Sequence, residues 1–227
     1  MSLYGKGMLI TFSETPPEVE EDFNEWYNRE HIDERVWMPG FHRARRYVDA
    51  NSNADIKYFA TYETDKVEYL ADPEYMELLK DQSDWSKKVM STFTKFDRIT
   101  ASVTIDLSHG FRGACLAARF FPGIEIMSKL RDNLEDNLLP NIVSTPGIIG
   151  AVLVENNLSV VNEGRRAQGM KIPENETPEW IILIEAQDNK VLSHHANKLI
   201  EAGLSEFELE PSDINIGVYN LMFGNNR

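Results

Sequence analysis

The chain has 227 residues, of which 23 are Lys or Arg and 37 are Asp or Glu, so its net charge is −14. Such an acidic surface repels phosphate backbones and anionic lipids, so we expect neither a nucleic acid nor a membrane as partner. Cys115 is the only cysteine, and no apolar run reaches the length of a membrane span. The N-terminus also lacks signal-peptide features, and we therefore expect a cytoplasmic protein.

Six elements are predicted in the first half. Short apolar runs bounded by Gly, Ser and Asp predict strands, and Pro16-Pro17 followed by acidic residues predicts the start of a helix. The pattern predicts a strand at 7–12, a helix from 16 to about 37, strands at 41–48 and 56–63, helical segments between 65 and 96, and a strand at 101–107. This is the element order of a ferredoxin-like βαββαβ unit.

The same order recurs in the second half. Strands are predicted at 115–121, 148–154, 180–185 and 214–222, with helices at 124–143 and 191–202. An offset of 107 aligns Tyr27 with Leu134 and Pro39-Gly40 with Pro146-Gly147. We therefore predict an α+β fold of two tandem ferredoxin-like units, 1–108 and 109–227. The loop at 155–179 is longer than its counterpart in the first unit, and we expect it to be functional or mobile.

The first predicted helix carries a stripe that begins with aromatic side chains and ends with ionisable ones. At about 100° per residue, Trp26 and Tyr27 lie on the core-facing arc, Glu30 and Glu34 project into its middle, and His31 lies at its edge. Either the end of this helix extends out of the core into solvent, or its ionisable side chains form the floor of a polar pocket. We favour the pocket. There His31 is the candidate general acid or base, and Glu30 or Glu34 would orient it.

The strand that follows carries Arg43, Arg45 and Arg46. Alternation places Arg43, Arg45 and Tyr47 on one face of this strand. These arginines either form salt bridges with the acidic helix or hold an anionic ligand, because a guanidinium fork matches a carboxylate or enolate. In the second interpretation Arg45 holds the anionic group of a substrate.

Aromatic side chains near these groups have two interpretations. Trp26, Tyr27, Trp37 and Tyr62 are predicted to lie in the core, yet aromatic rings beside polar groups also suit a flat ring ligand. In a pocket, Tyr47 or Trp26 would pack on such a ring. Trp26, Tyr27, Arg45, Tyr47 and Tyr62 are therefore the candidate substrate-binding residues.

The two halves differ where the candidate residues lie. At the offset of 107, Glu30 aligns with Asn137, His31 with Leu138, Glu34 with Asn141, Arg45 with Val152 and Tyr47 with Val154. Only the first half gathers ionisable groups, so we predict the chemical site there and a scaffold role for the second half.

Trp26-Tyr27, His31 and Pro39-Gly40-Phe41 together resemble the dimeric α+β barrel superfamily and, within it, the EthD-like proteins. The resemblance covers the first half, whereas only the element order and Pro146-Gly147 extend it to the second. It implies antiparallel sheets paired into a barrel, with ligands between sheet and helices and His31 in the pocket. Relatives include cofactor-independent monooxygenases, polyketide cyclases, decarboxylases, isomerases and proteins without known activity.

Our leading hypothesis is a cofactor-independent enzyme that acts on a small aromatic or carboxylate-bearing metabolite. We expect no metal, because the helix supplies a single histidine, and the chain lacks Gly-rich phosphate loops and nucleophile elbows. The alternative is a non-catalytic ligand-binding or stress-associated protein in which these residues are structural. An eight-stranded barrel could close within one chain or between two, and since unpaired edge strands need cover, we predict a homodimer.

Overall fold

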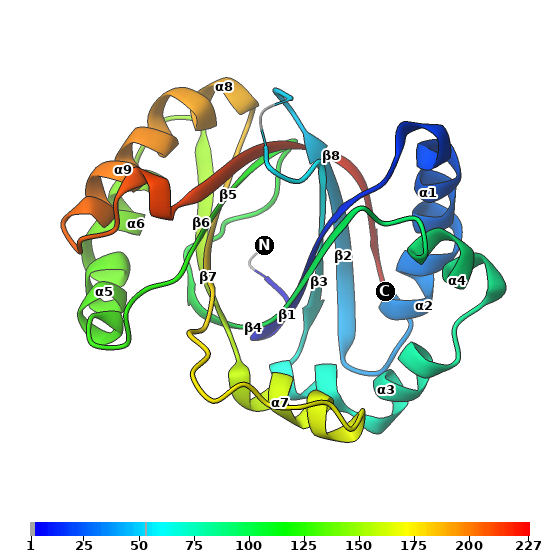
Figure 1. Cartoon of the computed structure of the whole chain (residues 1–227). Coiled ribbons are helices and arrows are strands. Elements are labelled where there is room, and N and C mark those ends of the chain that lie inside the picture. Colours follow the sequence, from blue (N-terminus) through cyan, green and yellow to red (C-terminus); the bar gives the residue numbers. More distant parts are fainter. Residues whose placement is uncertain (1–2, 53) are drawn as a thin grey trace.

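The strands form one closed antiparallel barrel in the computed structural model, which describes residues 3–52 and 54–227 (Figure 1). Around the barrel the order is β1 (Gly7–Glu14), β3 (Tyr58–Thr64), β2 (Phe41–Asp49), β8 (Asn215–Asn226), β5 (Ala114–Phe120), β7 (Trp180–Ala186), β6 (Ile148–Asn156) and β4 (Lys95–Asp106), which pairs with β1 again. Each neighbouring pair is antiparallel. The fold is therefore a mixed α+β fold with an eight-stranded barrel.

The barrel closes within a single chain. Strands of the two halves join at β2–β8 and at β4–β6, so every described strand is hydrogen-bonded on both sides. The unpaired edges from which we predicted a homodimer do not occur in the described part of the chain. The homodimer therefore remains a prediction, but unpaired strand edges no longer support it.

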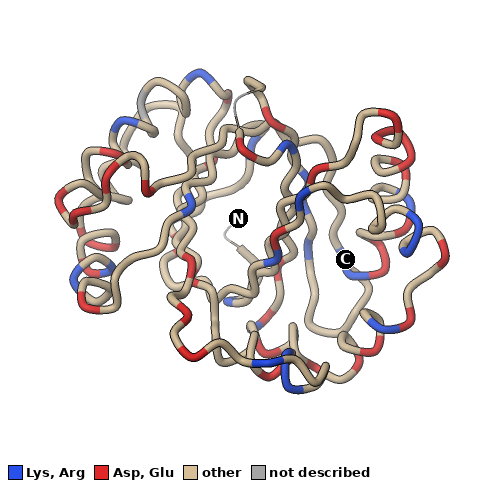
Figure 2. Tube along the Cα trace, in the orientation of Figure 1, with Lys and Arg blue, Asp and Glu red and all other residues tan. Residues whose placement is uncertain are grey.

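Helices surround the barrel on the outside (Figure 1). In the first half these are α1 (Glu20–Trp26), a π-helical turn (Tyr27–His31), α2 (Ile32–Val36), a 3₁₀ turn (Val67–Ala71), α3 (Pro73–Lys80) and α4 (Asp84–Met90). In the second half they are α5 (Met127–Asn133), a π-helical turn (Leu134–Leu138), α6 (Leu139–Val143), α7 (Leu158–Ala167), α8 (Asn189–Val191), a π-helical turn (Leu192–Ala196) and α9 (Asn197–Ser205). Acidic residues are spread over the helices of both halves (Figure 2). None of the described helices is long and apolar enough to cross a membrane.

Several landmarks of the two halves are 107 residues apart. The π-helical turns at Tyr27–His31 and Leu134–Leu138 have this spacing, as do the bounds of β2 and β6. Gly40 and Gly147, which precede those strands, both have a positive φ, at 78° and 93°. Such a backbone favours glycine, so the Pro-Gly pairs end each helix with the same turn into a strand.

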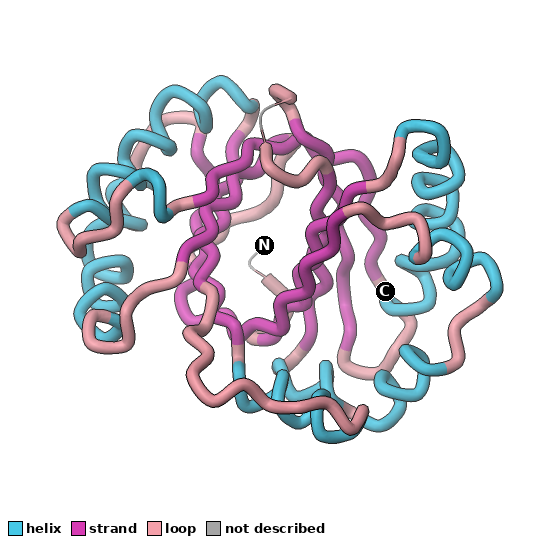
Figure 3. The backbone as a smooth tube through the Cα atoms, in the orientation of Figure 1, coloured by secondary structure: helices cyan, strands magenta, loops and turns pink. Residues whose placement is uncertain are grey.

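Figure 3 shows the strands as a ring with the helices outside it. Alternation along the strands divides the core into an inner layer within the barrel and an outer layer beneath the helices. Met8, Ile10 and Phe12 of β1 point into the barrel, where they meet side chains of the second half such as Val154 and Ile181. The outer layer of the first half lies between the sheet and the helices, and it includes Leu9, Ala44, Tyr62, Phe23 and Trp26. Both faces of β1 and β3, and of most of β2, are therefore buried.

Three features differ from the predictions. The loop at 155–179 contains α7, whose first turn is capped by Asn157: its side chain accepts from the Val160 amide at 3.2 Å and donates to Ser102 Oγ at 3.0 Å. This second-half helix lies against the 3₁₀ turn Val67–Ala71 of the first half. Strand β4 begins at Lys95, six residues earlier than predicted. Trp37 was wrongly predicted to be core, since it is 63% exposed.

Candidate functional site

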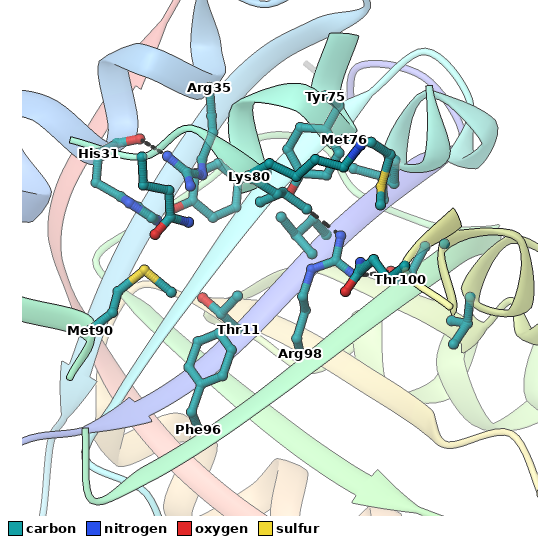
Figure 4. Close-up of a pocket in the computed structure, with 18 of the residues that line it drawn as sticks. Thr11, His31, Arg35, Tyr75, Met76, Lys80, Met90, Phe96, Arg98 and Thr100 are labelled. Carbon is teal, nitrogen blue, oxygen red and sulfur yellow. Dashed lines mark hydrogen bonds between the residues drawn. The ribbon is translucent and has the colours of Figure 1, made fainter. Parts of the chain in front are cut away.

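A cavity of about 420 Å³ lies between the outer face of the first-half sheet and the elements that cover it (Figure 4). Its floor includes Leu9 of β1, Tyr62 of β3 and Thr100 of β4, and Leu9 pairs with both of the others. Because β1 lies between β3 and β4, the two outer strands are about 10 Å apart. The volume and this span suit a small organic ligand.

His31 lies in one wall of the cavity, at the end of the π-helical turn. The imidazole is in contact with aromatic rings: its centroid is 4.0 Å from that of Trp26, 4.9 Å from that of Tyr27 and 6.4 Å from that of Tyr62. Burial, and then the positive charges of Arg35 and Arg46, hold the pKa of His31 well below 6.5. The imidazole is therefore neutral at neutral pH and can accept a proton.

Three residues that line the cavity each have a buried polar atom without a hydrogen-bond partner among the described residues. These atoms are Thr11 Oγ1, His31 Nδ1 and the Tyr62 hydroxyl. Burial raises the pKa of Tyr62 well above 10, so its hydroxyl keeps its proton. Because an unpaired buried polar atom is unfavourable, a ligand with matching groups would gain free energy by pairing with them.

Arg35 brings a positive charge to the same wall. Its side chain is 4% exposed, and Nη1 donates to the His31 carbonyl oxygen at 3.0 Å and to Glu34 Oε2 at 3.1 Å. A guanidinium beside a neutral imidazole can stabilise an anion formed when the imidazole takes a proton.

The two predicted carboxylates have hydrogen-bond partners other than the imidazole. Glu30 accepts hydrogen bonds from Ser83 Oγ at 2.5 Å and Ser86 Oγ at 3.1 Å, and so attaches the first helix to the start of α4. Glu34 is partly exposed, and its partner is Arg35; burial raises the pKa of Glu34. Among the described hydrogen bonds neither carboxylate reaches the His31 ring, so the geometry gives no support to their orienting role.

The expectation that Arg45 and Tyr47 share a pocket with His31 needs correction. Both side chains point into the barrel, where Arg45 pairs with Glu185 and, at 3.3 Å, with Glu63, and where Tyr47 stacks on Phe59 with a centroid distance of 4.4 Å. The sheet separates them from the cavity on its outer face. A ligand in that cavity therefore cannot contact them.

The ion cluster also explains why the halves differ at Arg45. Glu63 pairs with Met8 and Glu185 with Cys115, and these strand partners are 107 residues apart. Each half therefore sends a glutamate into the same region of the barrel, and Arg45 of the first half pairs with both, while Arg43 also pairs with Glu63 at 2.8 Å. The difference between Arg45 and Val152 is therefore explained by the need for a cation beside these glutamates inside the barrel.

Trp26, Tyr27 and Tyr62 do line the cavity with His31. Sequence reasoning missed Thr11, Arg35 and Arg98, and it missed the wall that α7 supplies through residues such as Val161 and Gly164. Strand alternation could have found Thr11, because it lies two residues from Leu9 on the same face. No local signal relates α7 to a cavity in the other half.

Comparison with known structures shows that other chains share this fold over nearly their whole length. An anthrone oxidase-like protein superposes with a TM-score of 0.66 at 10% identity, covering 98% of this chain and 93% of that one. A candidate monooxygenase of Lactobacillus acidophilus gives 0.60 at 10% identity, with 97% and 96% covered. A candidate monooxygenase of Fusobacterium nucleatum subsp. nucleatum gives 0.60 at 11% identity, with 99% and 96% covered.

No family model matches the chain, and no curated protein matches it in sequence. At these identities the structural likeness establishes the α+β barrel fold.

Proposed function

We propose that the protein is a cofactor-independent enzyme of the monooxygenase type that acts on an aromatic ketone or phenol. The observation that carries this proposal is the buried neutral His31 at an aromatic-walled cavity lined by Tyr62 and Thr11, each with an unpartnered polar atom. The names of the structural neighbours, anthrone oxidase-like protein and candidate monooxygenase, agree with it.

In the proposed reaction His31 removes a proton from an acidic C–H or O–H group of the ring ligand. Arg35 and the Tyr62 hydroxyl stabilise the resulting oxyanion. Trp26 and Tyr27 pack against the ring and exclude water. The electron-rich anion then reacts with molecular oxygen: a ring methylene loses two hydrogens and becomes a carbonyl, and the second oxygen atom leaves as water.

Oxidation of anthrone tests the proposal. Oxygen uptake and anthraquinone absorbance are followed with purified protein in EDTA, without added flavin or metal. We expect the wild type to accelerate the reaction and His31→Gln to lose roughly 100-fold or more in kcat/KM, as for removal of a general base. Glu30→Gln serves as a control that keeps most of the rate, because the Glu30 side chain does not line the cavity and bonds instead to Ser83 and Ser86.

Equal rates for the wild type and His31→Gln would refute the catalytic assignment. Saturable binding of the ring without any turnover would instead favour the non-catalytic ligand-binding protein.

We also propose that the halves, 1–108 and 109–227, are tandem ferredoxin-like units of one ancestry and that they resemble EthD-like proteins. The repeated π-helical turns and Pro-Gly turns at a spacing of 107 support this. In that arrangement the first unit holds the site, and the second closes the barrel and adds α7 as a wall.

A further inference from the structure

The charge of the cavity lining is opposite to that of the whole chain. Among the described residues that line it are Arg35, Lys80, Arg98 and Arg165, and none is Asp or Glu. In the whole chain, by contrast, acidic residues outnumber basic ones by 37 to 23. Figure 2 shows how widely those acidic residues cover the surrounding helices. A lining with this composition selects for negative charge in a ligand.

The cationic side chains differ in how far they are neutralised. Arg165 of α7 forms a two-point ion pair with Glu176, one contact being 2.9 Å. Arg98 of β4 instead donates to two neutral groups, the Thr100 hydroxyl at 2.8 Å and the Tyr75 hydroxyl at 3.4 Å. No described ion pair involves Arg98. Its guanidinium is thus held in place by hydroxyls with its charge still available.

Lys80 adds a second cation on this side. It extends from the end of α3, and its ammonium lies 3.6 Å from Glu77, a distant and solvated pairing. Figure 4 shows Arg98 and Thr100 on one side of the cavity and His31 with Arg35 on the other. A ligand with one ring at His31 would therefore reach Arg98 with its opposite end.

We propose that Arg98, assisted by Lys80, binds a carboxylate, and that the ligand is an aromatic ring compound carrying a carboxylate group. The guanidinium supplies the fork that matches a carboxylate, and Thr100 and Tyr75 fix its orientation. Placing the reacting ring at His31 rests on the proposed function, whereas the carboxylate subsite can be tested by binding alone.

The test compares anthraquinone-2-carboxylate with anthraquinone-2-carboxamide, which has nearly the same shape but no charge. Dissociation constants are measured by calorimetry in low salt for the wild type, Arg98→Met, Lys80→Met and the control Arg166→Met. Arg166 is exposed on α7 and does not line the cavity. Arg166→Met therefore removes one positive charge from α7 without changing the cavity lining.

We expect the wild type to prefer the carboxylate by about 5-fold, the upper range for an ion pair at an exposed site, because Arg98 and Lys80 are both exposed. Arg98→Met removes this preference, Lys80→Met reduces it, and Arg166→Met keeps it. In 0.5 M salt the wild-type preference shrinks, because exposed charges are screened.

Equal affinity for the two probes, loss of the preference in Arg166→Met as well, or binding of neither probe would overturn the subsite. Repeating the comparison in His31→Gln separates this proposal from the proposed function. If the carboxylate preference persists while the wild type does not oxidise anthrone, the subsite stands and the proposed function fails. If the wild type oxidises anthrone and anthrone-2-carboxylate with equal kcat/KM and binds the two anthraquinone probes equally, the proposed function stands and the subsite fails.

Discussion

Burial of a neutral histidine predicts a specific dependence of stability on pH. In the folded protein the pKa of His31 lies well below 6.5, chiefly because burial disfavours the charged form. In the unfolded chain the imidazole regains its ordinary pKa near 6.5. As the pH falls below 6.5, the unfolded state takes up a proton that the folded state does not. Folding stability is therefore lost with falling pH, between 6.5 and the lowered folded pKa.

The size of the loss follows from proton linkage. Within that window each pH unit lowers the free energy of unfolding by about 1 kcal/mol for one proton. Only the step from pH 6.5 to 5.5 lies in the window, so lowering the pH from 7.5 to 5.5 costs about 1 kcal/mol from His31 alone. His31→Leu removes the titrating group and introduces the residue that occupies position 138, at the offset of 107. The other histidines and the carboxylates are common to both proteins and cancel in the difference.

Urea unfolding of wild type and His31→Leu at several pH values measures this difference. We expect the stability gap between them to shift by about 1 kcal/mol in favour of the variant as the pH falls from 7.5 to 5.5. His31→Gln, which keeps a polar side chain but cannot titrate, should show the same shift whatever its absolute stability. Parallel pH profiles for the three proteins would refute a neutral, buried His31.

Three further predictions concern the cavity wall, the barrel and the reaction. Gly164 has open space where a Cβ would lie, so Gly164→Ala should stabilise α7 by about 0.5–1 kcal/mol in urea unfolding. Gly164→Leu should fill the cavity and weaken binding of anthraquinone-2-carboxylate, whereas the control Ala167→Leu should not. Tight binding by Gly164→Leu would contradict this. Arg45→Met leaves Glu185 buried without its counter-ion and should lower the free energy of unfolding by roughly 3–5 kcal/mol. The double variant Arg45→Met/Glu185→Met should regain much of that stability. If the losses of the two single variants simply add in the double variant, the pair is not coupled. For anthrone oxidation, kcat/KM should stay level from pH 8 down to 6.5 and fall only below that, because protonated His31 cannot act as a base; a half-maximal rate above pH 6.5 would exclude His31 as that base.

Local sequence signals were sufficient for most of the fold. The strands follow from apolar runs, and the ends of the first helices of both halves follow from Pro-Gly pairs, where the glycine adopts a positive φ. Strand β4 was predicted to start too late, because Lys95 and Phe96 lie at an exposed rim where no buried alternation marks a strand. Helix α7 was missed because it buries a single residue, Val160, and contains a glycine.

The candidate site was predicted only where one helix or one strand face determined it. His31, Trp26 and Tyr27 come from one helical stripe, and helical periodicity brings them together. The placement of Arg45 and Tyr47 failed because alternation separates two faces of a strand without saying which one meets the helices. In a closed barrel both faces are buried, so hydrophobicity cannot decide between them.

The halves therefore differ for two separate physical reasons, which the sequence comparison had joined into one. The contrast of Arg45 with Val152 belongs to the barrel interior, where the Arg45 guanidinium bridges a glutamate from each half. The contrast of His31 with Leu138 belongs to the outer layer, where Leu138 is part of a packed apolar core and His31 borders a cavity. Because α7 of the second half supplies a wall of that cavity and buries Val160 in the first-half core, the site is a product of both halves. The dimensions of the cavity thus depend on a helix that the first half does not contain.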